Sequence, residues 1–432
     1  MLNWKKALSL IGFLLLALLL CSCGSKAATA PVVTAAPAPE TVLLDGIEYE
    51  PGVDTLSLES AEAVDALVNN AGRFSALRDV TLAEPPSAAQ LNALREALPG
   101  AALHYTVNAA GKALTSDAVS ADLSSLPEKD VQAAAQALAL LPDLQRVSLS
   151  LDLPVEAYVE LKKAAPGARF DYAFDLFGQT VTEDTESLYY ENVEIGNLGV
   201  IQFLRVLPCL DKLTELTFEY CGISDWAMAD LRDAFPDKKI VWRVVYGWGS
   251  SMSDAETIWA IGGFNDSQLY SLRYCTEVKY LDLGHNGIYS LDFVRYMPKL
   301  EVLIVENDYV SDLSALSECK TLEYLEVGET QVKDVSPLAG CTGLEHLNIG
   351  GLPGVTDISP LYGLPKLKRL YGLCDVNVPA EQVEYIKSIM PDTEIDFDYY
   401  PQGAVNGSHW RYDENGIVPR YQLLHDQMGY YW

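Results

Sequence analysis

The fold is set by residues 278–366, which read VKYLDLGHNGIYSLDFVRYMPK, LEVLIVENDYVSDLSALSECKT, LEYLEVGETQVKDVSPLAGCTG and LEHLNIGGLPGVTDISPLYGLPK. The four segments are 22, 22, 22 and 23 residues long, and each opens with apolar residues in the spacing L-x-x-L-x-L. A later apolar residue recurs at a matching position, as Ile288, Val310, Val332 and Val355. Four tandem matches at a fixed period predict a stack of repeats, in which each unit buries its apolar side against its neighbours.

This pattern resembles the leucine-rich repeat and is close to the 22-residue form of the bacterial internalins. The sequences DVSPL at 334–338 and DISPL at 357–361 belong to that form. The asparagine that is usual in the motif is kept at Asn286, whereas Asp308 and Thr330 replace it in the next two segments. The resemblance implies an α/β solenoid, with a curved parallel sheet on its concave face and helices and 3-10 turns on its convex face.

The flanking sequence carries a second, longer period. Four times, a helical stripe of apolar residues ends at a proline, and an alternating run typical of a half-buried strand follows. We interpret each long unit as three irregular leucine-rich turns, so residues 45–400 are expected to form one curved solenoid. The alternating runs include Leu103/Tyr105/Val107, Phe170/Tyr172/Phe174 and Ile240/Trp242/Val244; the prolines are Pro99, Pro166, Pro236 and Pro391, and the glycines near the twelfth position after them are Gly111, Gly178, Gly247 and Gly403.

The N-terminus has the features of a bacterial targeting signal. Lys5 and Lys6 precede a Leu-rich run over 7–20, which suits a signal peptide and is short for a membrane span. Residues 20–24, LCSCG, resemble the lipobox of bacterial lipoproteins, in which a cysteine is lipidated and becomes the mature N-terminus. The match places that cysteine at Cys23; an ordinary secretory signal with a chance cysteine is the alternative.

These patterns divide the chain into six parts. The last part is rich in Trp and Tyr, and we expect it to cap the exposed end of the solenoid, with a second recognition surface as the alternative. The parts are a lipoprotein signal peptide (1–22), a lipidated cysteine and Ala/Pro-rich tether (23–44), irregular long-period repeats (45–277), internalin-like repeats (278–366), final repeat turns (367–402) and the aromatic cap (403–432).

The concave face of the sheet is the expected binding surface. In L-x-x-L-x-L the leucines point into the core, and the residues between them point out of the sheet. The resulting columns mix aromatic, apolar and acidic residues, which resembles a protein-binding patch more than a solvated face. Ladders that only stabilise the sheet through cross-strand contacts are the alternative. The predicted ligand-binding residues are Tyr280, Asp282, Ile304, Glu306, Tyr324, Glu326, His346, Asn348, Arg369 and Tyr371.

Charge restricts the class of partner. The chain has 30 Lys and Arg against 60 Asp and Glu, a formal net charge of -30. Phosphate binding rests on Lys and Arg, so this balance argues against nucleic acid and against electrostatic attachment to anionic lipid. The negative field favours a cationic partner.

The sequence shows no catalytic or metal-binding motif. Its 8 Cys and 5 His form no CxxC, HExxH, GxSxG or phosphate-loop pattern, so we expect no enzyme, cofactor or metal site. Calcium at the acidic strand with Glu394, Asp396 and Asp398 is conceivable, but a solvated acidic edge is favoured. Cys319 and Cys341 are one turn apart at an apolar position, where buried thiols are favoured and a disulfide is within reach.

Together these features predict a lipoprotein anchored on the extracytoplasmic face of a bacterial cell membrane. It would bind an unknown protein or peptide on the concave face of its repeats. Recognition of a glycan or of the cell wall is one alternative, since exposed aromatic rings beside acids also suit sugars. A structural spacer, or a regulatory subunit of an envelope complex, is another.

Overall fold

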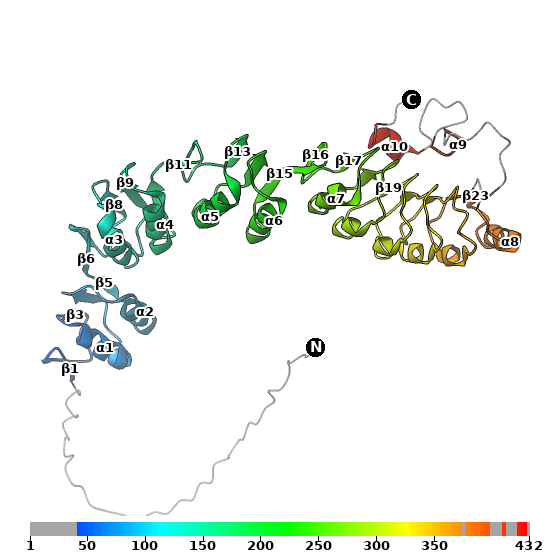
Figure 1. The fold of residues 1–432 in the computed structure, drawn as a ribbon. Helices are drawn as coiled ribbons and strands as arrows, with labels where there is room; N and C mark the ends of the chain where they lie inside the picture. Colours follow the sequence, from blue (N-terminus) through cyan, green and yellow to red (C-terminus); the bar gives the residue numbers. More distant parts are fainter. Residues whose placement is uncertain (1–40, 373–375, 398–407, 412–420, 430–432) are drawn as a thin grey trace, which may run out of the picture. The chain divides into compact units, whose positions relative to one another are not determined.

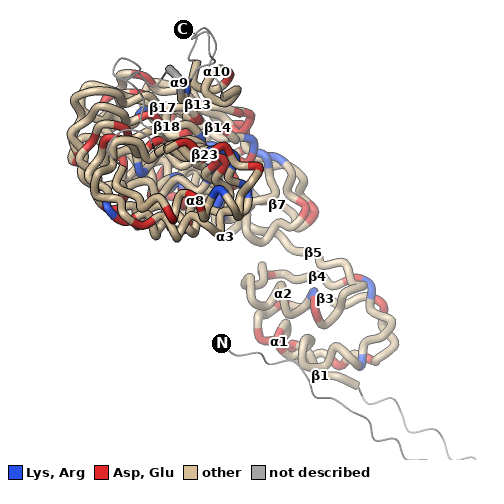
Figure 2. The backbone as a smooth tube through the Cα atoms, turned by 90° about the vertical axis from the view of Figure 1, so that its right-hand side faces the viewer, with Lys and Arg blue, Asp and Glu red and all other residues tan. Residues whose placement is uncertain are grey.

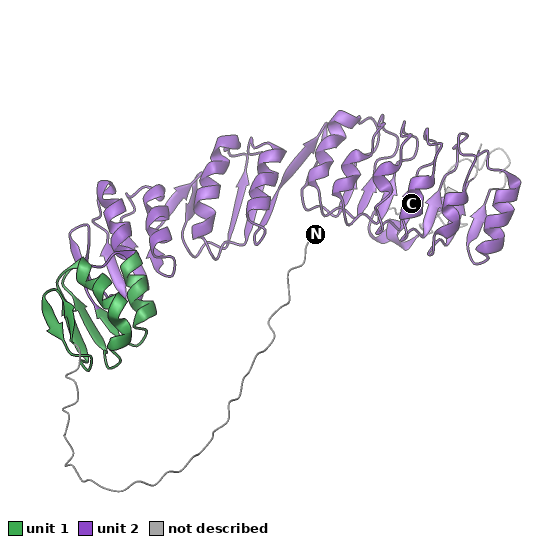
Figure 3. Ribbon diagram, turned by 90° about the horizontal axis from the view of Figure 1, so that it is seen from below, with its two compact units in different colours: residues 1–84, 89–103 green, residues 85–88, 104–432 purple. Residues whose placement is uncertain are grey.

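The computed structural model describes residues 41–372, 376–397, 408–411 and 421–429. The predicted signal peptide, Cys23 and most of the tether lie outside these residues. The chain divides into two compact units, one of residues 1–84 with 89–103 and the other of residues 85–88 with 104–432 (Figure 3). Within the described ranges, no helix has both the length and the hydrophobicity needed to cross a bilayer.

The first unit is a hairpin followed by a three-stranded sheet. Helix α1 begins at Ala61 because the Ser60 hydroxyl accepts the backbone N–H of Ala63 at 3.2 Å, which satisfies one of the unpaired donors of the first turn. The elements are the hairpin β1 (Val42–Leu44) and β2 (Ile47–Tyr49), the sheet strands β3 (Thr55–Leu58), β4 (Asp79–Leu82) and β5 (Ala102–His104), the helices α1 (Ala61–Asn70) and α2 (Ala88–Ala97), and a 3-10 turn at Ala71–Arg73.

The second unit opens with two more sheets that each contain three parallel strands, as the interpretation of three turns per long unit expects. The first is made of β8 (Ser120–Leu123), β9 (Arg146–Leu149) and β10 (Arg169–Asp171), and the second of β13 (Ser187–Glu191), β14 (Glu215–Glu219) and β15 (Lys239–Tyr246). The connections contain α3 (Val131–Leu138), α4 (Val155–Ala164), α5 (Gly196–Val206) and α6 (Asp225–Ala234), with 3-10 turns at Glu128–Asp130 and Leu207–Cys209.

Antiparallel hairpins interrupt the solenoid. They are β6 (Thr106–Ala109) with β7 (Lys112–Thr115), β11 (Phe174–Leu176) with β12 (Gln179–Val181), and β15 with β16 (Gly249–Met252). The runs through 103–107 and 170–174 are therefore two strands each, one in a repeat sheet and one in a hairpin. In each hairpin the antiparallel pairing involves residues that follow the parallel ladder, and the described strands of 45–400 form four repeat sheets instead of one continuous sheet.

The regular repeats form a parallel sheet of seven strands (Figure 1). The central leucine of strands β18 to β22 pairs with the next across the sheet, and all five are fully buried. This register confirms the predicted leucine-rich repeat solenoid. The strands are β17 (Thr257–Trp259), β18 (Tyr280–Asp282), β19 (Val302–Ile304), β20 (Tyr324–Glu326), β21 (His346–Asn348), β22 (Arg369–Tyr371) and β23 (Glu394–Asp396). The connections contain α7 (Asp266–Leu269), α8 (Ala380–Ile389) and 3-10 turns at Tyr270–Tyr274, Asp292–Tyr296, Ser314–Leu316, Ser336–Gly340 and Ser359–Gly363.

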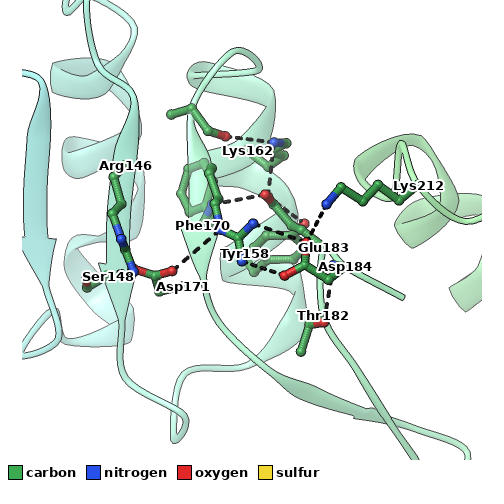
Figure 4. A network of polar contacts seen from close by, with 12 residues as sticks. Arg146, Ser148, Tyr158, Lys162, Phe170, Asp171, Thr182, Glu183, Asp184 and Lys212 are labelled. Atoms are coloured by element: carbon green, nitrogen blue, oxygen red, sulfur yellow. Dashed lines mark hydrogen bonds and ion pairs between the residues drawn. The ribbon is translucent and has the colours of Figure 1, made fainter. Parts of the chain in front are cut away.

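A buried ion pair links helix α4 to the chain just after the β11–β12 hairpin (Figure 4). Lys162 Nζ lies 3.0 Å from Glu183 Oε1, and the two side chains are only 10% and 13% exposed. Glu183 also accepts hydrogen bonds from the Tyr158 hydroxyl at 3.2 Å and from the Phe170 backbone N–H at 3.1 Å. One carboxylate thus holds the hairpin against the preceding repeat turns.

Candidate binding face of the seven-stranded sheet

Two columns of outward-facing residues cross the seven-stranded sheet. They form because each strand keeps the offset of one repeat, so equivalent residues pair across every gap between strands. Nine of the ten predicted residues lie in these columns. One column contains Thr257, Tyr280, Val302, Tyr324, His346, Arg369 and Glu394, and the other contains Trp259, Asp282, Ile304, Glu326, Asn348, Tyr371 and Asp396.

Glu306 is the tenth predicted residue and lies just beyond strand β19. It occupies the repeat position of Gly284 and Gly328 in the neighbouring turns. A Cβ atom at Gly328 would come within 2.7 Å of the backbone oxygen of Gly350. Glu306 is therefore a side chain at a position where the neighbouring turns have glycine, and at Gly328 the backbone leaves no room for one.

The C-terminal segment, defined here as residues 408–411 and 421–429, covers this face. It contains α9 (Ser408–Arg411) and α10 (Gln422–Asp426), which lie along the sheet (Figure 1). Tyr324 is 0% exposed beneath it, and so is Trp410. The buried cluster that joins segment and sheet consists of Tyr280, Val302, Ile304, Tyr324, Trp410, Tyr421, Leu424 and Met428.

Arg411 provides the polar centre of this contact. Its Nε donates to Glu326 Oε1 at 2.9 Å, and its Nη2 donates to Glu326 Oε2 at 2.6 Å. The same Nη2 donates to Glu306 Oε2 at 2.7 Å. The Tyr324 hydroxyl donates to Glu326 as well. A bidentate guanidinium–carboxylate pair is among the strongest and most directional contacts available to a protein surface.

The Arg411 guanidinium donates to two carboxylates, and their pKa values shift in opposite directions. Burial raises the pKa of Glu306 to about 8, and the nearby charge of Glu326 adds to that rise. Burial also acts to raise the pKa of Glu326, but the charge and hydrogen bonds of Arg411 outweigh it and leave the pKa lowered. Glu326 is therefore the ionised partner of Arg411, and Glu306 retains a proton near neutral pH.

Arg369 joins the two described parts of the segment to the sheet. Its Nη1 donates to the backbone oxygen of Trp410 at 2.8 Å and to the Tyr421 hydroxyl at 2.7 Å. Its guanidinium carbon lies 4.7 Å from the centre of the Trp410 ring, and the Tyr421 ring lies 4.0 Å from that of His346. These contacts combine cation–π attraction with hydrogen bonds inside a buried site.

The structure thus brings the predicted residues together, but beneath the chain's own C-terminus. The described parts of 403–432 lie across the concave face, whereas the expected cap would cover the last turn. Sequence reasoning did not single out Trp410, Arg411 or Tyr421 as contacts of this face. One feature of the sequence could have indicated this contact. Arg411 follows a tryptophan in an acidic chain, and the predicted concave face contains glutamates with which an arginine can pair.

The cysteines and acidic residues provide no second chemical centre in the described part of the chain. Cys319 and Cys341 are free thiols, and burial raises the pKa of Cys341 to about 12. No group of three Cys, His, Asp or Glu side chains that could hold a metal is found among the described residues. Glu394 pairs with Arg369 at 3.3 Å, while Asp398 of the proposed calcium edge lies outside those residues.

Comparison with known proteins yields similar structures only. No family model matches the chain, and no curated protein matches it. An internalin from Listeria monocytogenes is 18% identical, with 73% of this chain and 91% of that one covered and a TM-score of 0.31. A leucine-rich repeat protein of Leptospira interrogans is 14% identical, with 80% and 90% covered and a TM-score of 0.28. The functional domain of InlJ from Listeria monocytogenes is 11% identical, with 78% and 62% covered and a TM-score of 0.30. At these values the likeness carries no conclusion about ligands, and the leucine-rich repeat assignment rests on the register of the strands.

Proposed function

We propose that this protein is an extracytoplasmic lipoprotein that binds a protein or peptide through the concave face of its seven-stranded sheet. The observation that carries the proposal is the fit between this face and the C-terminal segment. Aromatic anchors in a desolvated centre, next to a paired arginine, are the features that dominate binding energy in protein interfaces. A surface with these features is suited to hold a chain segment.

In the described state the face is closed, so a partner has to displace the C-terminal segment. The partner then has to supply a cation, because Glu326 left buried without Arg411 is an uncompensated charge. It also has to fill the space of the Trp410 ring against Tyr324 and Tyr371. The chemistry that meets both needs is a segment with an aromatic residue next to an arginine, and the excess of acidic residues on the protein favours such a cationic partner (Figure 2).

A peptide exchange experiment tests this proposal. Full-length protein with Trp410→Ala and Arg411→Ala should bind a labelled peptide of residues 404–432, whereas the wild type should bind it much more weakly, because its face is occupied. The same peptide with Arg411→Ala should lose affinity by at least about tenfold, as expected for one charge-assisted hydrogen-bonded pair. Fluorescence anisotropy provides the measurement.

The matched control for the exchange experiment is the exposed Lys320→Ala, which should bind the peptide as weakly as the wild type. Equal peptide affinity for the wild type and the double variant would contradict a closed face. In-cell crosslinking of the double variant, with and without Glu326→Ala, then tests whether a protein partner uses the same surface.

The lipid anchor rests on the sequence LCSCG at 20–24. Cys23→Ala should abolish metabolic labelling with palmitate, because the acylated sulfur is removed. Cys21→Ala is a closely matched control and should keep the label. Equal labelling of the wild type and both variants would refute the anchor while leaving the peptide-binding proposal intact.

A further inference from the structure

A cleft of about 450 Å³ lies away from the concave columns, between helix α6 with strand β15 on one side and the 3-10 turn Tyr270–Tyr274 on the other. We propose that this cleft binds a carbohydrate that carries a carboxylate, such as a uronic acid. Its volume lies within the range of about 300–1,000 Å³ that is typical of small-molecule sites. It lies between the β13–β16 sheet and the turn that precedes the first regular repeat.

Aromatic rings form the walls of the cleft. Trp226, Tyr220 and Tyr270 line it and are 57%, 55% and 49% exposed. Arginines lie over the rings of Tyr220 and Tyr270, so Trp226 is the main stacking surface offered to a ligand. Trp242 forms a buried part of the lining, and its indole Nε1 donates to Asp225 Oδ1 at 2.8 Å. The negative face of an aromatic ring attracts the weakly positive C–H groups of a sugar ring, and removing both surfaces from water adds to the attraction.

Arg273 supplies the positive charge of the cleft. Its guanidinium carbon lies 4.1 Å from the centre of the Tyr270 ring and 4.7 Å from that of Tyr274, and its Nη2 donates to the Tyr274 hydroxyl at 2.6 Å. Among the residues that the structure describes, no carboxylate lies within ion-pair distance of Arg273, although its charge acts to lower the pKa of the nearby Asp225. The other arginine of the lining, Arg243, is already paired with Glu219 at 2.5 Å. Arg273 is therefore a preoriented cation in a chain with twice as many acids as bases.

The polar groups at the cleft match the hydroxyls of a sugar. Ser224, Asp225 and Ser271 belong to the lining, and Asp225 is already hydrogen-bonded to Trp242 and Ser271. The Ser224 hydroxyl donates to Asn197 Oδ1 at 3.0 Å, which leaves its oxygen able to accept. A single carboxylate on the ligand meets the charge of Arg273, whereas the acidic field of the chain disfavours polyanions such as nucleic acids. These features together favour an acidic sugar over a neutral sugar or a phosphate-rich ligand.

Tryptophan fluorescence of the full-length protein tests the inference, because Trp226 and Trp242 both line the cleft. Titration with digalacturonic acid should give a saturable change, and the uncharged disaccharide of galactose should bind at least about tenfold more weakly. Arg273→Met should remove most of that difference by lowering the affinity for the acid at least about tenfold. Trp226→Ala should weaken both sugars, because it removes the stacking surface.

Arg295→Met is the matched control, because Arg295 occupies the position of Arg273 one repeat later and pairs with Asp292 at 3.4 Å. It should leave the affinity for the acid unchanged. Absence of a saturable change, equal affinity for the two sugars, or equal loss from Arg273→Met and Arg295→Met would each overturn the inference. Since the cleft is separate from the concave columns, failure here leaves the proposed peptide binding untouched, and the converse also holds.

Discussion

Asp308 shows what one residue does to the interior of the solenoid. It holds the position of the motif asparagine, and in the preceding turn Asn286 donates from Nδ2 to the backbone oxygens of Ala260 and Leu283 at 2.6 and 2.5 Å. Asp308 accepts from the backbone of Ile288 at 3.3 Å, but its Oδ2 is buried without a hydrogen-bond partner. Burial raises the pKa of Asp308 from 3.8 to about 7.

We predict that Asp308→Asn stabilises the protein at pH 8 by about 1–3 kcal/mol, because a buried unsatisfied carboxylate is replaced by an amide that can donate. A raised pKa means that the folded state holds its proton more tightly, so stability falls as pH rises between about 3.8 and 7. The variant should lack this part of the pH dependence. Chemical denaturation at pH 5 and pH 8 measures the change, and a variant less stable than the wild type at pH 8 would contradict it.

Glu306 gives the docked segment a pH dependence of its own. Because its pKa rises from 4.5 to about 8 in the folded state, segment docking should weaken as pH rises through this window. Glu306→Gln should remove the effect and protect the segment at pH 8.5, while the exposed Glu318→Gln should not. Trypsin cleavage after Arg411, followed over pH 6 to 8.5, provides the measurement. Cleavage rates of wild type and Glu306→Gln with the same pH profile would exclude this role.

At the level of elements, a hairpin follows each of the three repeat sheets that have three parallel strands. In the β6–β7 hairpin the two turn residues, Ala110 and Gly111, have φ of 53° and 87°. Positive φ at both positions is typical of a type I′ turn, whose twist matches that of its strands. Glycine tolerates such angles, whereas alanine is strained there.

We predict opposite effects from neighbouring substitutions in this turn. Gly111→Ala should destabilise by about 1 kcal/mol through backbone strain alone, since no atom lies within 4 Å of the added Cβ. Ala110→Asn should stabilise by a few tenths of a kcal/mol, because Asn-Gly is a favoured type I′ pair. Thermal unfolding of both variants provides the test, and the same sign for both would contradict the assignment.

The buried Lys162–Glu183 ion pair also fixes how two elements pack, helix α4 and the chain after the β11–β12 hairpin (Figure 4). Glu183→Gln should destabilise by about 3–5 kcal/mol, because it leaves the buried Lys162 ammonium without its counter-charge. Asp184→Asn, one residue further on, should have a much smaller effect, because Asp184 pairs with Arg169 and Lys212 at the surface. Denaturant unfolding compares the two variants, and similar losses would refute the difference in burial.

In the whole molecule, the C-terminal segment decides whether the concave face is available. It forms contacts between residues that are far apart in the sequence. Arg411 is 85 positions from Glu326 and 105 positions from Glu306, and it bonds to both. The face beneath it carries apolar and aromatic side chains, which monomeric proteins rarely leave exposed as one patch.

We predict that removal of residues 404–432 exposes this patch. Binding of a hydrophobic dye should increase and the melting temperature should fall, because Tyr324, Ile304 and their neighbours lose their cover. The variant with only Lys320→Ala should behave like the wild type. Unchanged dye binding and melting after truncation would mean that the segment contributes nothing to the folded state.

The repeat, its register and the residues of the concave columns could all be predicted from the amino-acid sequence. Which side chains of a repeat are buried depends on residues only a few positions apart. A pattern such as L-x-x-L-x-L therefore predicts the buried positions directly. The sequence also predicted three turns per long unit, but not the hairpins between them, because an alternating run such as 103–107 fits a repeat strand and a hairpin strand equally well. That the C-terminal segment covers the predicted face became visible only in the folded protein. That contact depends on the shape and charge of two surfaces far apart in the chain, and no local pattern encodes which of them will meet.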